Sequence, residues 1–277
     1  MLQIQTIVEN KSSLNRALEP EFGLSFLLKT DDYTILFDCG SDDVGVKNAR
    51  RSNVQLEDIA YTVLSHSHFD HAGGYPDFLE KGLRSPLVTG THFWEEKYAV
   101  QEGKYVYLGC GFNPSLLQLK GIKHLICEDT LELFPNCYAV SNFTRKYQRE
   151  IIPTRFKRRT ENGMIADDFV DEVSLVIERP KGLVVIVGCS HPGILNMLSS
   201  IKERFGKKIY GVFGGAHLKD ADVDRIDDTV VALGNLGIEI MGLNHCTGDN
   251  AEKAINDKCV GMKIVSLHTG EGILLDI

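Results

Sequence analysis

The chain has 277 residues, 25% of them charged, and a formal net charge of −8, so it can bury a sizeable core as a soluble globular protein. The acidic balance argues against non-specific binding of nucleic acid or of an anionic membrane as the main role. No stretch approaches the roughly 20 apolar residues that span a bilayer. The seven cysteines include no C-x-x-C pair, so we expect a cytoplasmic protein with reduced thiols.

The first half of the chain is predicted to be rich in strands, because short apolar or alternating runs are separated by polar turns. The expected strands cover residues 1–9, 22–28, 33–37, 59–64 and 86–89, with one helix over 44–51. Residues from about 92 to 165 follow no regular pattern. We expect them to form an irregular insertion within a single domain that spans residues 1–277.

From residue 174 onward, strands and helices alternate. The expected strands are 174–178, 183–187, 209–213, 238–243 and 263–267, followed by a final strand that ends at Ile277. Helices are expected over 194–205, about 222–236 and 251–256. The first two of these strands form a hairpin, and the alternation that follows predicts parallel β-α-β units.

A dense cluster, His66-x-His68-x-Asp70-His71, directly follows the buried strand 59–64. Residues two apart on an extended chain project to the same side, so His66 and His68 can hold one ion. Beyond the strand the chain turns, and Asp70 and His71 can address a second ion. Imidazole and carboxylate suit zinc, iron or manganese, and ions ~3.5–4 Å apart support two-metal hydrolysis. A chance histidine-rich surface turn is the simpler alternative, but it does not explain this density.

Histidines recur at the ends of the predicted strands. Five strands lead into His66, His191, His217, His245 and His268, respectively. Ligands of α/β sheets bind at the carboxyl ends of the strands, so this distribution predicts one active site assembled from several strand ends. We interpret His268, in the terminal hairpin, as a packed or exposed side chain.

The cluster, with Asp38 closing the preceding strand, resembles the metallo-β-lactamase superfamily. The resemblance implies an α/β fold, a four-layer αββα sandwich with a dinuclear site along one edge. Segments 188–193, 214–218 and 245–248 are similar to one branch of that superfamily. This branch contains the archaeal dihydropteroate-synthase-like enzymes of methanopterin biosynthesis and many metal-dependent hydrolases.

The resemblance also implies the first ligands and their cofactor. His66 and His68 would bind one metal ion, and Asp70 and His71 the other. The expected cofactor is a pair of divalent ions, with zinc as the first choice and iron or manganese as alternatives. Asp38 is expected to orient a ligating imidazole and so to fix its tautomer.

The remaining ligands depart from the commonest pattern of the family. Many relatives carry a histidine before the 174–187 hairpin and a bridging aspartate at its end, and this chain has neither. We therefore predict His191 as the third imidazole of the first ion and His245 as the last ligand of the second. Cys189 lies near the bridging place, where it is either a ligand or a small buried residue.

Three further residues are candidates for catalysis or substrate binding, and Asp70 is a candidate base as well as a ligand. His217 competes with His245 as a ligand and is otherwise a catalytic contact to the substrate. The basic stretch 145–159 is either a solvated flank or a wall that presents Arg155 and Arg158 to a phosphate or carboxylate.

These patterns lead to three hypotheses about function. The first is a hydrolase that uses a metal-activated water on a small phosphoester or ester. The alternative is a synthase of the methanopterin type, which condenses a dihydropterin diphosphate with a phosphorylated arylamine. The third is a metal or redox module without hydrolytic turnover. We expect a small-molecule substrate and no nucleic-acid or membrane partner, and a homo-oligomer is left open.

Overall fold

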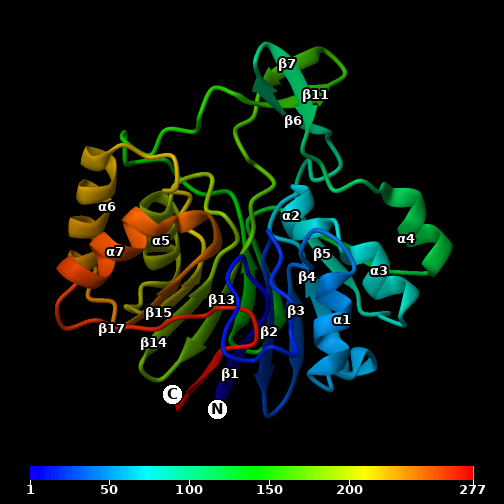
Figure 1. The fold of residues 1–277 in the computed structure, drawn as a ribbon, viewed down its shortest axis with the longest axis horizontal. Coiled ribbons are helices and arrows are strands. Elements are labelled where there is room, and N and C mark those ends of the chain that lie inside the picture. Colours follow the sequence, from blue (N-terminus) through cyan, green and yellow to red (C-terminus); the bar gives the residue numbers. More distant parts are fainter. Residues whose placement is uncertain (277) are drawn as a thin grey trace.

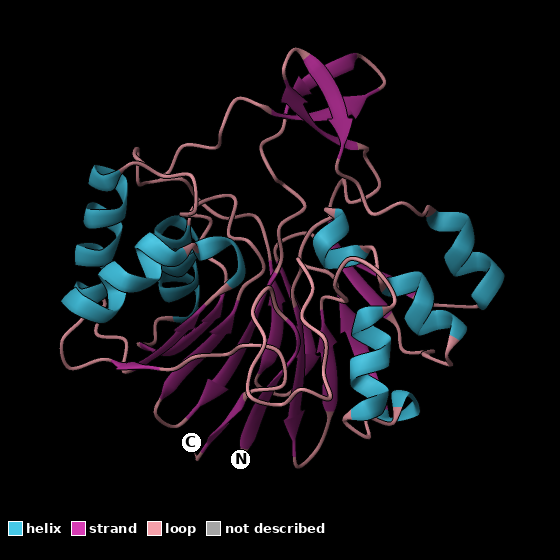
Figure 2. Cartoon of the chain, viewed as in Figure 1, coloured by secondary structure: helices cyan, strands magenta, loops and turns pink. Residues whose placement is uncertain are grey.

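Two seven-stranded sheets pack face to face in the computed structural model, which describes residues 1–276. Helices cover the outer side of each sheet, so the chain forms four layers (Figures 1 and 2). The expected αββα sandwich is therefore confirmed. Within the described residues, the structure contains no helix that is both long and apolar enough to cross a membrane.

The first sheet combines the N-terminal strands with the last strand of the chain. Its order is β18 (Gly272–Leu275), β1 (Leu2–Val8), β2 (Ser25–Thr30), β3 (Thr34–Phe37), β4 (Ile59–Val63), β5 (Leu87–Gly90) and β8 (His124–Cys127). Strands β3, β4, β5 and β8 run parallel to one another. Their carboxyl ends therefore lie at one edge of the sheet.

The second sheet is built mainly from the C-terminal half of the chain. Its order is β17 (Lys263–Ile264), β16 (Ile240–Leu243), β15 (Ile209–Gly214), β14 (Gly182–Ile186), β13 (Ser174–Arg179), β10 (Cys137–Val140) and β9 (Thr130–Phe134). Strands β14 to β17 are parallel, as the alternation of strands and helices predicts.

Strand β14 shows why its sequence is apolar throughout. Val184 and Ile186 face the other sheet, whereas Leu183 and Val185 face the covering helices. A strand that is buried on both faces reads as a continuous hydrophobic run. The helices on that side are α5 (Ile194–Phe205), α6 (Val223–Asn235) and α7 (Asp249–Lys258).

Shorter helices cover the first sheet. They are α1 (Val44–Arg51), η1 (Leu56–Asp58), α2 (Phe69–Ala72), α3 (Tyr75–Glu80) and α4 (Pro114–Lys120). Tyr75 and Phe78 of α3 are fully buried against this sheet, beside Val46 of α1.

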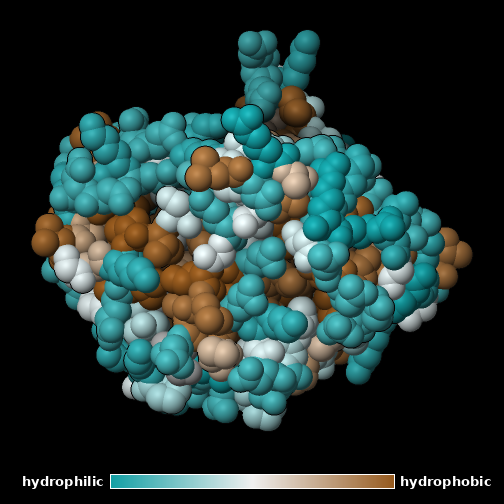
Figure 3. Space-filling view, turned by 60° about the horizontal axis from the view of Figure 1, so that its bottom comes forward, coloured by the Kyte–Doolittle hydropathy of each residue, from teal (hydrophilic) through white to brown (hydrophobic). Residues whose placement is uncertain are grey.

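The expectation of an irregular segment over residues 92–165 is wrong. That segment supplies α4, β8, β9 and β10 to the sandwich, and most of a separate four-stranded sheet. The order of this small sheet is β12 (Gly163–Ala166), β11 (Phe156–Thr160), β6 (Lys97–Gln101) and β7 (Lys104–Tyr107). It projects from the top of the sandwich in Figure 1, with hydrophilic tips in Figure 3. Strand β7 is exposed along its whole length, so it lacks the pattern of buried and exposed residues that marks a strand.

Several predicted boundaries also shift. Strand β2 begins at Ser25 rather than at residue 22, and the chain at Gly23 lies against the loop that carries Asp70. A Cβ at Gly23 would be 2.6 Å from the backbone oxygen of Asp70. Strand β17 is shorter than predicted and α7 longer. The predicted end of the last strand, Ile277, lies outside the described residues.

Candidate metal centre

Loops that follow the carboxyl ends of strands in both sheets meet at one edge of the sandwich, below the projecting small sheet (Figure 1). Gly188, after β14, makes this approach possible, because a Cβ there would lie 2.2 Å from Ser65 Oγ after β4. Only glycine permits so close a passage. The contact brings Cys189 next to the histidine cluster that follows β4.

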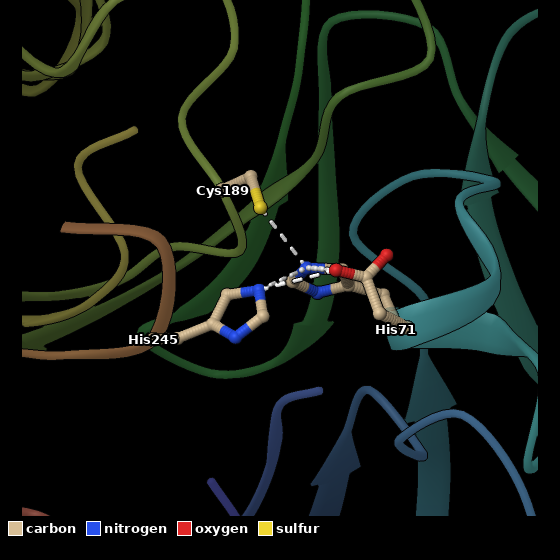
Figure 4. Close-up of side chains that lie close together, drawn as sticks. His71, Cys189 and His245 are labelled. Atoms are coloured by element: carbon tan, nitrogen blue, oxygen red, sulfur yellow. Dashed lines mark hydrogen bonds and ion pairs between the residues drawn. The ribbon is translucent and has the colours of Figure 1, made fainter. Parts of the chain in front are cut away.

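The first set of candidate ligands, here named the His71 group, consists of Asp70, His71, Cys189 and His245. All four are buried, and their ligand atoms lie within 4.8 Å of one another. His71 Nε2 lies 3.1 Å from Cys189 Sγ and 3.2 Å from His245 Nε2. In Figure 4, Cys189 and His245 approach His71 from different segments of the chain and point toward a common centre.

Both imidazoles of the His71 group are oriented through their far nitrogen. His71 Nδ1 lies 2.6 Å from Asp38 Oδ2, and His245 Nδ1 lies 2.9 Å from Asn10 Oδ1. Because these oxygens are acceptors, each Nδ1 carries the proton. Burial lowers the pKa of His71, but Asp38 and Asp70 outweigh this effect and raise it above the ordinary value. The surroundings of this group therefore favour positive charge.

The second set, the His66 group, consists of His66, Cys189 and His191, whose ligand atoms also lie within 4.8 Å of one another. His68 lies beside it, with its ring centre 4.7 Å from that of His66 and 4.9 Å from that of His191. Within residues 1–276, buried Nε2 atoms of all three histidines have no hydrogen-bond partner. Unpaired buried nitrogens are costly, and a bound cation would satisfy them.

The protonation of the His66 group suits metal binding. Burial and neighbouring imidazoles hold the pKa of His66 and of His191 well below the ordinary value. Burial lowers the pKa of His68 to about 3. These rings are neutral at pH 7, so their lone pairs are available to a divalent ion. The residues present therefore fit a metal centre.

Buried carboxylates fix the loops that carry the candidate ligands by accepting hydrogen bonds from their backbone N–H groups. Glu172 accepts the backbone N–H groups of Ser190 (2.9 Å) and His191 (3.3 Å). Asp171 accepts the N–H of Ser67 at 3.0 Å. Sequence reasoning missed both carboxylates, although the acidic run over residues 167–172 was a signal for them.

Glu9, which directly follows β1, holds the loop of His245 in the same way. Its carboxylate accepts the backbone N–H of His245 at 2.9 Å. Three residues at the site have unfavourable backbone conformations. Asp38, Ser190 and His245 have φ values of 58°, 58° and 55°, in the left-handed region that favours glycine. Such strain at a candidate site is typical of functional loops that the surrounding structure holds in place.

Aromatic side chains support His191 and close the site. Phe169 stacks on the His191 ring, with centroids 3.8 Å apart and planes 13° apart. Phe156, from β11 of the small sheet, lies 5.4 Å from His191 and 5.8 Å from His217. The projecting sheet therefore contributes an aromatic wall to the site.

The structure separates the two competing candidates for the last ligand. His245 belongs to the His71 group, whereas His217 belongs to neither group of described residues. His217 instead lies beside His191, with ring centres 4.3 Å apart. Burial and the nearby Arg155 and Arg225 lower the pKa of His217 to about 4, so its ring is neutral at pH 7.

The two candidate arginines differ in position. Arg155 pairs with Asp220 at 2.7 Å, and its guanidinium lies 4.9 Å from the ring centre of Phe156, next to His217. Arg158 pairs with Glu95 at 2.5 Å and with Asp168 at 3.2 Å. The structure therefore brings Arg155 to the border of the site and does not place Arg158 there.

A cavity of about 380 Å³ opens beside His245. Its walls include Asn10, Lys11 and Lys219, together with the start of α7. The Lys219 ammonium lies 5.8 Å from the ring centre of Phe22, and that ring lies 5.4 Å from His245. Phe22 is 49% exposed, so an aromatic face and a cation flank the His71 group on its open side.

Comparison with known proteins places this site in a family. The sequence profile of the metallo-beta-lactamase superfamily matches residues 18–82, which include the histidine cluster. A 7,8-dihydropterin-6-methyl-4-(beta-D-ribofuranosyl)-aminobenzene-5'-phosphate synthase from Methanocaldococcus jannaschii is 32% identical over 264 residues, covering 91% of this chain and 89% of the relative.

Solved structures agree with this comparison. The crystal structure of Tm1679, a metal-dependent hydrolase of the beta-lactamase superfamily, matches with a TM-score of 0.84 and 29% identity over 99% of both chains. The metallo-beta-lactamase fold protein YhfI from Bacillus subtilis matches over 98% of both chains with a TM-score of 0.58 and 14% identity, which shows the fold alone. The chain belongs to the metallo-beta-lactamase superfamily, as its motifs predict.

Proposed function

We propose that this chain is a metal-dependent synthase that joins a dihydropterin to a phosphorylated ribofuranosyl arylamine. The observation that carries the proposal is its 32% identity, over 91% of its length, to the synthase from Methanocaldococcus jannaschii. This likeness supports the alternative drawn from the sequence better than it supports simple hydrolysis. The His71 and His66 groups would hold the divalent ions.

The reaction is a substitution at the carbon next to the pterin ring. The arylamine nitrogen forms a bond to this carbon, the bond from carbon to the diphosphate oxygen breaks, and the amine loses a proton. Bound divalent ions would supply positive charge to the leaving diphosphate. His217, neutral at pH 7 and next to His191, is the candidate to accept the proton from the amine.

The border of the site suits such substrates. Phe22, which is 49% exposed, offers a ring face on which a flat pterin or aryl group can stack, and the buried Phe156 contributes an apolar wall. Lys219 and Arg155 lie over these same two rings and offer positive charge to phosphate groups. Aromatic faces paired with cations are the chemistry that recognises a phosphorylated aromatic molecule.

The proposal is tested with full-length protein loaded with zinc, iron or manganese. Given a hydroxymethyl-dihydropterin diphosphate and the phosphorylated arylamine, the protein should release diphosphate and form the condensed product, detected by mass spectrometry. The Asp70→Ala, His71→Ala double variant should form none. Metal-loaded wild type that forms no product from both substrates would contradict the proposal.

A hydrolase is the second candidate, favoured by the likeness to Tm1679 at 29% identity over 99% of both chains. The same buried ligand groups would hold divalent ions, which would lower the pKa of a bound water toward ~7. Asp70, in the His71 group, is then the candidate base. Turnover of a chromogenic phosphodiester by the wild type, and not by the double variant, would favour this candidate over the synthase if no condensed product forms.

A further inference from the structure

Cys189 is, among the residues that the structure describes, the one member common to the His71 group and the His66 group. Within each group the ligand atoms lie within 4.8 Å of one another, so its sulfur lies between the places that two ions would take. We propose that the Cys189 thiolate bridges the two metal ions. This inference rests on the proposed metal-dependent function and specifies the ligand that joins the two ions.

Neighbouring carboxylates are already engaged and do not compete for the bridging place. Asp38 uses Oδ1 to accept the N–H of Ser65 and Oδ2 to contact His71 Nδ1. Both oxygens of Glu172 accept backbone N–H groups of the loop that follows Cys189. Asp70 belongs to the His71 group only.

The backbone around Cys189 holds its sulfur in place. Gly188 passes directly over Ser65, and its carbonyl oxygen accepts the N–H of Gly215 at 2.8 Å. Glu172 holds the next two residues, and Cys189 itself is 3% exposed. The thiol therefore points into the site from a fixed turn, as pre-organised ligands do.

The chemistry of sulfur is compatible with a bridge. A zinc–sulfur bond is about 2.3 Å long, so two such bonds can span the ~3.5–4 Å between the ions of a dinuclear site. A thiolate also carries the same single negative charge as a bridging carboxylate. Because it is a softer ligand, it should select zinc, iron or cobalt over manganese and magnesium.

Cys246 provides a matched control. Its sulfur accepts the N–H of His217 at 3.3 Å and lies 3.5 Å from the carbonyl oxygen of Cys189, so it is a buried thiol next to the site. It belongs to neither ligand group. Replacement by serine keeps a small hydrogen-bonding side chain there.

X-ray absorption at the metal edge of the full-length, cobalt- or zinc-loaded protein tests the bridge. The wild type should bind two ions per chain. Because a bridging sulfur is bound to both ions, its spectrum should show an average of one sulfur per ion. Cys246→Ser should give the same result. Cys189→Ser and Cys189→Asp should show no sulfur, and Cys189→Asp should bind manganese more tightly, relative to zinc, than the wild type does.

Each other result overturns the inference in a recognisable way. An average of half a sulfur per ion means a terminal ligand, and no sulfur means that Cys189 does not bind. A single ion at saturating metal also excludes a bridge, while the metal-dependent function stands. A wild type that binds no metal removes the proposed function as well. If Cys189→Ser does not fold, the wild-type spectrum and Cys189→Asp decide.

Discussion

The carboxylate of Asp38 lies 2.6 Å from Nδ1 of His71, and both side chains are fully buried. Asp38 is itself held by the N–H and hydroxyl groups of Ser65, at 2.7 and 2.8 Å. This arrangement fixes the proton of His71 on Nδ1 and directs Nε2 toward the other members of the His71 group.

Asp38→Asn should therefore weaken metal binding by about 10–100-fold, because the amide can present an N–H to Nδ1 and so favour the wrong tautomer. Asparagine tolerates the left-handed backbone at this position, where φ is 58°, so the fold should persist. Competition with a coloured chelator measures the affinity. Asp32→Asn, in the exposed turn before β3, is the control. Equal affinities in the two variants would contradict this role.

Lys97→Met should destabilise the protein by about 3–5 kcal/mol, because it breaks a buried ion network from one side. Lys97 is 1% exposed, and its ammonium lies 2.8 Å from Asp171 and 2.9 Å from Asp167. Urea unfolding of the metal-free protein measures the loss. Lys104→Met, on the exposed strand β7, should change the free energy of unfolding by no more than ~0.5 kcal/mol. Similar values for both variants would count against the network.

Glu150 should make stability depend on pH. It accepts the N–H groups of Leu195 and Asn196 at the start of α5, and burial raises its pKa from 4.5 to about 7. The folded chain then binds a proton that the unfolded chain releases. The contribution of Glu150 is thus fully present below pH 4.5 and is lost as pH rises to about 7.

The size of this effect is on the order of 3 kcal/mol, from the difference between the two pKa values. The difference in unfolding free energy between wild type and Glu150→Gln, followed from pH 4.5 to pH 8, isolates it. The wild type should lose stability relative to the variant over this range. A constant difference would show that the pKa of Glu150 is the same in the folded and the unfolded chain.

The sandwich was predictable where local pattern and burial agree. Strand β14 is buried on both faces and reads as an apolar run, and α5 has a clear apolar face, so both were placed within a residue of their observed bounds. The small sheet was not predicted. Its strand β7 is fully exposed, so no local periodicity marks it, and the neighbouring β6 pairs with β11, which lies far along the chain.

In the candidate site, too, some residues could be predicted from the sequence and others could not. His66, His71, His191 and His245 were chosen because imidazoles cluster or end strands, and the structure brings them together. The supporting contacts depend on tertiary structure. The stack of Phe169 on His191, and the carboxylate of Glu172 behind that loop, join residues about twenty apart whose pairing no motif encodes.

The central claim is that this edge of the sandwich holds two metal ions. The most direct test is the number of tightly bound ions per full-length chain, measured by elemental analysis after loading with zinc and removal of excess metal. The wild type should retain two. The His71→Ala, His245→Ala variant and the His66→Ala, His191→Ala variant should each retain fewer, because each loses one ligand group. A folded wild type that retains no ion would contradict the account.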